Sequence, residues 1–171
     1  HSARVSDIAR EAGVADGTIY RYFESKEQVL LTIFEEKMEE HLVMLSERID
    51  GLDCPMDRLE AFARHHFEQL RRHPDLAQVF QVELRQSHRF LKDYRPEKLW
   101  QYIGVLQTLV EEGRRRGLVR EDVDPVMASW SYFGALDELA IQWVLARNRE
   151  RFNLDKAAEQ VASFFIRGMA A

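Results

Sequence analysis

Apolar side chains recur every three to four residues along most of the chain, which is the spacing of one face of an α-helix. The clearest stripe joins Leu59, Phe62, Phe67 and Leu70 and stops before Pro74. No stretch shows the strict apolar–polar alternation of a half-buried β-strand. The pattern therefore predicts an all-α protein.

Glycines and prolines separate these periodic stretches, so they give the expected limits of each helix. The pattern predicts two short helices followed by about six longer ones. The predicted helices cover residues 5–12, 16–23, 25–50, 59–70, 76–89, 96–116, 125–148 and 155–169.

Three helix starts carry capping signals. Ser25 with Gln28 three residues later fits a capping box. Asp124 before Pro125 fits an N-cap followed by proline at the first helical position. Asp155 is the expected cap of the last helix.

The charge balance limits the kind of partner that the chain can bind. Its 171 residues carry 24 Lys plus Arg against 29 Asp plus Glu, a net charge of −5. A protein that coats nucleic acid should be basic, so any DNA contact must be local. No apolar run is long enough to cross a membrane, and we expect a cytoplasmic protein with no membrane partner.

The sequence contains no motif typical of a metal site or of an enzyme active site. Cys54 is the single cysteine, which excludes an internal disulfide and a multi-cysteine metal site. His65 and His66 point to different faces of a helix and make a poor chelate. Phosphate-loop, dinucleotide and His-Glu-x-x-His motifs are missing. We expect no catalytic residue, no metal site and no cofactor.

The segment 5–23 fits a helix-turn-helix. Ala9 is small enough for the point where two helices cross, and Gly13 tolerates the positive φ of a tight turn. Apolar anchors for the second helix are present at Ile8, Val14, Ile19 and Phe23. The alternative is a plain corner between two helices of a helical enzyme.

In a helix-turn-helix the second helix enters the major groove of DNA. Gly17 lets the backbone come close, the hydroxyls of Thr18, Tyr20 and Tyr22 suit phosphate oxygens, and Lys26 begins the next helix. The candidate DNA-binding residues are Arg4, Asp16, Gly17, Thr18, Tyr20, Arg21, Tyr22 and Lys26.

This segment resembles the DNA-binding signature of TetR-family transcriptional regulators. The resemblance rests on Ile8-Ala9, Ala12-Gly13-Val14, Gly17-Thr18-Ile19-Tyr20, Tyr22-Phe23 and Lys26-Glu27. It implies an N-terminal helix-turn-helix over residues 1–27 and a C-terminal ligand-binding and dimerisation domain over residues 28–171. It also implies a homodimer on palindromic double-stranded operator DNA, which a ligand releases.

Two features depart from the family pattern. Family members have a helix before the motif that is missing here, and residues 1–27 carry four basic against five acidic side chains. Many relatives also carry Lys where this chain has Asp16. The Asp16 carboxylate either accepts from a cytosine amino group or caps the second helix, and we favour the cap.

Polar residues interrupt the apolar stripes of the second half, where burial requires hydrogen-bond partners. His66, Glu83 and Asp137 either form an internal network or line a pocket. A basic cluster close to that stripe either forms a solvated face or holds phosphates at a pocket mouth. The cluster comprises Arg85, Arg89, Lys92 and Arg95.

A narrower resemblance concerns three stretches, residues 13–20, 82–87 and 133–138, which look like the fatty-acid-degradation repressor (FadR-like) branch of the family. It implies release from DNA by long-chain acyl-CoA. Another lipophilic effector, or a helical lipid-binding module without DNA binding, are the alternatives. The candidate ligand-binding residues are His66, Phe67, Leu70, Phe80, Glu83, Leu84, Arg85, Arg89, Arg95, Trp100, Ile103, Phe133 and Asp137.

The last two helices mix large apolar residues with small ones that allow close approach. The family resemblance implies that they pair with their mates in a four-helix dimer interface, and packing within one chain is the alternative. The candidate interface residues are Trp130, Ile141, Trp143, Val144, Val161, Phe164 and Phe165.

Overall fold

The computed structural model describes residues 4–84 and 95–171, and for residues 83, 84 and 151 it describes the backbone alone. Eight α-helices form this part of the chain, and no strand is found in it. The helices are α1 (Val5–Glu11), α2 (Asp16–Tyr22), α3 (Lys26–Ile49), α4 (Pro55–Arg72), α5 (Pro74–Gln78), α7 (Glu97–Arg115), α8 (Pro125–Leu145) and α9 (Leu154–Met169).

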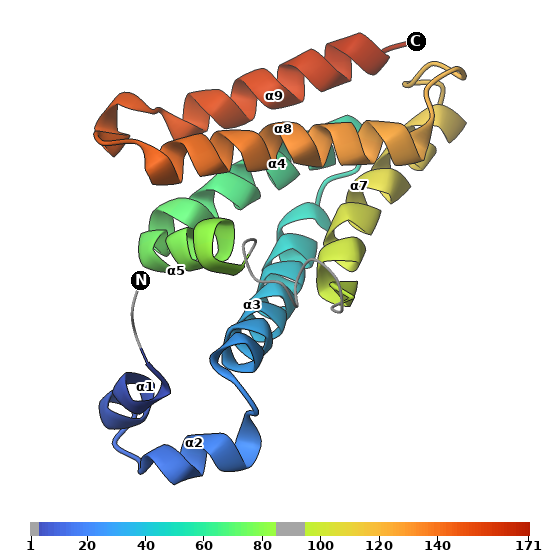
Figure 1. Ribbon diagram of the computed structural model, residues 1–171. Coiled ribbons are helices and arrows are strands. Elements are labelled where there is room, and N and C mark those ends of the chain that lie inside the picture. The colour runs from blue at the N-terminus through green and yellow to red at the C-terminus, as the bar shows by residue number, and fades with distance from the viewer. Residues whose placement is uncertain (1–3, 85–94) are drawn as a thin grey trace.

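The two short N-terminal helices stand apart from the others (Figure 1). Helix α3 starts beside α2 and runs into the main bundle, so it belongs to both parts of the molecule. Within the bundle α4 packs against α3, α7, α8 and α9, and α8 and α9 lie side by side along one face. The predicted boundary between residues 27 and 28 falls in the first turn of α3 and stays a prediction.

One continuous core joins five of the bundle helices, α3, α4, α7, α8 and α9. Leu45, Leu59, Leu106 and Leu136, from α3, α4, α7 and α8, are each fully buried. The hydroxyl of Tyr132 donates to the carbonyl oxygen of Leu59 at 2.8 Å, which satisfies a polar group inside this core. The core thus includes α3 from Phe34 to Leu45.

Side-chain caps mark the start of three of the longer helices, α3, α8 and α9. The side chain of Ser25 accepts from the backbone N–H of Gln28, and that of Asp124 accepts from Met127, so both predicted caps are confirmed. The predicted cap of the last helix is wrong by two residues. Asn153, not Asp155, accepts from the N–H of Lys156 at 2.9 Å.

Of the helix expected over residues 76–89, residues 85–89 lie outside the described part of the chain, and residues 76–84 belong to two shorter segments. α5 ends at Gln78, and a π-helical segment, η1, follows over Val79–Leu84. A π-helical turn is wider than an α-helical one and often occurs at functional sites. The end of α8 at Leu145 also precedes its expected end at residue 148.

Candidate functional sites

The turn between α1 and α2 has the geometry that a helix-turn-helix requires. Gly13 has a φ of 70°, the left-handed conformation that glycine adopts without strain. Ala9 is fully buried, and its carbonyl oxygen accepts from the N–H of Val14 at 2.9 Å. The small residue and the glycine therefore occupy the positions for which they were singled out.

The apolar anchors of this motif are less buried than the sequence suggested. Val14 is exposed, whereas Ile8, Ile19 and Phe23 are only half-buried. The cause is geometric, because α1 and α2 are seven residues each and sit away from the bundle core.

The predicted DNA-binding side chains lie mostly at the surface. Tyr22 is 69% exposed, and Arg4, Thr18, Tyr20 and Arg21 are also exposed. Lys26 is half-buried at the first position of α3. Their role in DNA binding stays a prediction.

The favoured role of Asp16 as the cap of α2 is wrong. Ala15 is the N-cap residue, and Asp16 occupies the first helical position with its side chain exposed. A carboxylate there still suits the positive end of the helix dipole. The other reading, a contact to a base, needs no cap and remains open.

An acidic side chain organises the start of α1. Asp7 accepts from the backbone N–H of Arg4 and from the guanidinium of Arg10, both at 2.9 Å. The Arg4 hydrogen bond first, and Arg10 second, lower the pKa of this carboxyl. Arg10 is therefore partly neutralised within the chain.

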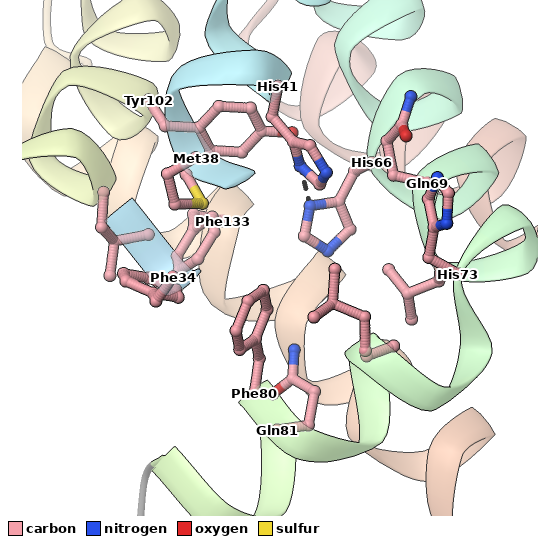
Figure 2. A pocket seen from close by; sticks show the side chains of 14 residues that line it. Phe34, Met38, His41, His66, Gln69, His73, Phe80, Gln81, Tyr102 and Phe133 are labelled. Atoms are coloured by element: carbon pink, nitrogen blue, oxygen red, sulfur yellow. Dashed lines mark hydrogen bonds between the residues drawn. The ribbon is translucent and has the colours of Figure 1, made fainter. Parts of the chain in front are cut away.

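A pocket of about 100 Å³ is lined by residues of α3, α4, α5, α7, α8 and η1 (Figure 2). Its wall is mainly apolar. The lining residues are Phe34, Met38, His41, His66, Gln69, Leu70, His73, Leu76, Ala77, Phe80, Gln81, Leu99, Tyr102 and Phe133.

Histidines form much of the polar part of this wall. The hydroxyl of Tyr102 lies 3.4 Å from Nδ1 of His66. Burial raises the pKa of Tyr102 well above its usual value, so the hydroxyl stays protonated. Burial lowers the pKa of His41 from 6.5 to about 4, so this ring is neutral at pH 7.

Gln81 and Asp137 connect η1 to α8 at the edge of the cavity. The amide nitrogen of Gln81 donates to Oδ1 of Asp137 at 3.1 Å. This bond joins a residue that lines the cavity to one that the sequence singled out as a polar interruption of a buried stripe.

A family model described as bacterial regulatory proteins of the tetR family matches residues 1–33, where the helix-turn-helix lies. A second model, described as the C-terminal region of YsiA-like protein, matches residues 34–168. The chain belongs to the TetR family. It therefore belongs to a family of transcription regulators, with the N-terminal and C-terminal domains of that fold.

Relatives within the TetR family include regulators of fatty acid metabolism. The "Fatty acid metabolism regulator protein" of Bacillus subtilis is 35% identical over 169 residues, which are 99% of this chain and 86% of the relative. A crystal structure of FadR from Bacillus subtilis in complex with stearoyl-CoA is 35% identical, with a TM-score of 0.88. FadR from Bacillus halodurans is 36% identical, with a TM-score of 0.87. Each match to a structure covers 99% of this chain and 90% of the other.

Four of the predicted ligand-binding residues line the cavity of this TetR-family chain, namely His66, Leu70, Phe80 and Phe133. Asp137 lies behind the wall, bonded to Gln81.

Other predicted ligand-binding residues lie elsewhere. Phe67 and Ile103 are buried in the core without lining the cavity, whereas Trp100 is 48% exposed and Arg95 is at the surface. Arg85 and Arg89 lie outside the described residues, as do the side chains of Glu83 and Leu84.

Sequence reasoning missed the contribution of α3. Phe34, Met38 and His41 line the cavity from this helix. They are spaced by four and three residues, which places them on one helical face. His41 interrupts that stripe as His66 interrupts the stripe on α4, and this signal could have identified it.

The predicted dimer residues divide into two groups in the isolated chain. Phe164 is 71% exposed, Trp130 is exposed, and Ile141 and Phe165 are half-buried. Trp143, Val144 and Val161 are buried within the bundle, so they offer little surface to a second chain.

Among the described residues, no group of three or more His, Cys, Asp or Glu side chains could hold a metal ion. None of the helices in the same part of the chain is long and apolar enough to cross a membrane.

Proposed function

We propose that this chain is a DNA-binding repressor of fatty-acid degradation genes, acting as a homodimer, and that long-chain acyl-CoA releases it from its operator. One observation carries the proposal. Helix α3 lines the cavity through Phe34, Met38 and His41, and only three residues separate the start of this helix from the end of α2.

The chemistry of the cavity wall suits an acyl chain, but the cavity must become larger to hold one. Its wall is mainly apolar, but a volume of about 100 Å³ is below the ~300–1,000 Å³ typical of small-molecule sites. An acyl chain must therefore widen the space between α3, α4 and η1. The bound complex then differs in structure from the ligand-free chain, as a ligand-controlled regulator requires.

Widening of the cavity acts on DNA binding through α3. A ligand that favours one position of this helix shifts the population toward it, and the recognition helices of a dimer no longer match two half-sites about 34 Å apart. Couplings of this kind change affinity by about 5–150-fold. Arg95, with Arg85 and Arg89, is proposed to hold the phosphates of CoA.

The release step is tested by measuring operator DNA binding while stearoyl-CoA is added, with an operator selected from genomic fragments. Ala77→Leu fills part of the cavity, so half-release should need about tenfold more stearoyl-CoA, relative to the operator affinity of the same variant. Ala61→Leu, a half-buried alanine outside the cavity, is the matched control. Release by another lipophilic compound but not by acyl-CoA would contradict the proposed effector.

The DNA contact is tested by Tyr22→Phe and Lys26→Ala. Both should weaken binding to operator and nonspecific DNA alike, and Lys26→Ala should also reduce the salt dependence by about one phosphate contact. Lys37→Ala, outside the helix-turn-helix, is the control. Unchanged binding by Lys26→Ala would show that this end of α3 does not contact DNA.

A further inference from the structure

The side chain of Gln81 is held in one orientation at the cavity wall. Its amide nitrogen donates to Oδ1 of Asp137 at 3.1 Å. A carboxylate only accepts hydrogen bonds, so the carbonyl oxygen of Gln81 cannot exchange places with the nitrogen without facing another acceptor. Asp137 thus fixes which end of the amide remains for other contacts.

The remaining end is a buried acceptor without a partner. Oε1 of Gln81 is fully buried and receives no hydrogen bond within the described part of the chain. Buried acceptors are almost always satisfied, because leaving one unpaired costs its hydration without replacement. Since Gln81 lines the cavity, a donor on a bound ligand can supply the missing hydrogen bond.

The surrounding wall favours a hydroxyl as that donor. Phe80, Leu76 and Phe34 line the same cavity and exclude a charged group, whereas the bonded pair His66–Tyr102 adds polar atoms from α4 and α7. A hydroxyl both donates and accepts, a ketone only accepts, and a methylene does neither. Of these three groups, only the hydroxyl can donate to Gln81.

We propose that Gln81 binds a hydroxyl on the acyl chain of the effector, so that hydroxylated long-chain acyl-CoA is preferred over unsubstituted acyl-CoA. This inference rests on the proposed function, because it assumes an acyl thioester in the cavity. The donors of the CoA part are common to all such ligands, so they cancel in a comparison between acyl chains.

The test is calorimetric titration of the full chain with stearoyl-CoA, with its 3-, 10- and 12-hydroxy derivatives and with the corresponding oxo derivatives. At least one hydroxy derivative should bind about tenfold more tightly than stearoyl-CoA. Its oxo counterpart should not share the gain, because its oxygen would face the Gln81 oxygen. The wild-type chain alone decides this point.

Three variants assign the preference to Gln81. Gln81→Leu should reduce the hydroxy-to-unsubstituted ratio to about one. Gln78→Leu, the same change three residues earlier at the end of α5 and outside the cavity, should keep the wild-type ratio. Asp137→Asn lets the Gln81 amide rotate and present its nitrogen to the ligand. The affinity for the oxo derivative should therefore rise relative to the affinity for the hydroxy derivative.

The outcomes separate the two proposals. Binding of stearoyl-CoA with no preference for any hydroxy derivative overturns the inference and leaves the proposed function intact. A preference that persists in Gln81→Leu also overturns it. If no acyl-CoA binds, both proposals fail.

Discussion

Two histidines of α3 and α4 are held neutral by burial. The rings of His41 and His65 pack edge to face with centroids 5.9 Å apart. His65 is only 1% exposed, and its Nε2 has no hydrogen-bond partner among the residues described. Desolvation lowers the pKa of both rings from 6.5 to about 4.

This burial predicts a loss of stability in acid. In the unfolded chain these histidines bind protons below about pH 6.5, whereas in the folded chain they bind them only near pH 4. The free energy of unfolding therefore decreases as the pH is lowered from 6.5 to 4. His65 alone should account for about 3 kcal/mol of that fall.

Urea unfolding of the wild type and of His65→Leu at pH 7.5, 5.5 and 4.5 measures the effect. The difference in unfolding free energy between the two chains should be constant above pH 7 and should shift in favour of the variant below pH 6. Parallel pH profiles would show that His65 titrates normally in the folded chain.

Substitution by alanine at two glycines of α7 should change the stability of the chain in opposite directions. A Cβ on the buried Gly113 of α7 would lie 2.8 Å from Cγ2 of Val119 and 2.9 Å from Cε of Met56. Gly113→Ala should therefore destabilise the chain by about 1–3 kcal/mol. Gly104→Ala meets nothing within 4 Å and should stabilise it by about 0.5–1 kcal/mol. Thermal unfolding of both variants gives the signs, and equal effects would contradict the packing of α7 against Val119.

At the scale of elements, two variants at the start of α9 distinguish the observed cap, Asn153, from the expected one, Asp155. Asn153→Ala removes the acceptor for the Lys156 N–H and should cost about 1 kcal/mol, or roughly 2–4 °C in melting temperature. Asp155→Ala removes only an exposed ion pair to Arg71 and should cost less than about 0.5 kcal/mol. Thermal unfolding of the two variants decides, and a larger loss in Asp155→Ala would restore the predicted cap.

Periodicity predicted the helices well, because each has an apolar stripe that must face the core. It did not predict the π-helical segment over Val79–Leu84, since the residues 76–89 keep a helical spacing on paper. Phe80 and Gln81 of this segment line the cavity, whereas the sequence singled out Phe80 and Glu83 as ligand-binding residues.

The cavity lining was only partly predictable for a related reason. Periodicity tells which face of a helix is buried, but not whether that face meets the core or an open space. Phe67 and Leu70 lie on the same stripe of α4, yet Leu70 lines the cavity and Phe67 packs into the core. That distinction depends on how the neighbouring helices are placed.

At the scale of the molecule, the face formed by α8 and α9 is the proposed contact between two chains. Phe164 and Trp130 expose large apolar surfaces there, and Met127 and Leu145 on α8 are exposed as well. Apolar residues of this size rarely gather on a surface that stays in water.

Phe164→Glu together with Trp130→Glu should convert a dimer into a monomer at micromolar concentration, because two like charges per chain would face their copies. Sedimentation measures the mass of each form. Val43→Glu changes an exposed apolar residue of α3, away from this face, and should keep the wild-type mass. A wild-type monomer would contradict the dimer itself.

The length of α3 turns it into a lever between the two ends of the chain. Met38, at the cavity, lies twelve residues from Lys26. At about 1.5 Å per residue that arm is about 18 Å long, so a tilt of only about 5° displaces Lys26 by about 1.6 Å. The donor–acceptor distances of hydrogen bonds vary over a range of only about 0.5 Å. A rotation of a few degrees is therefore sufficient to break contacts at the far end of the arm.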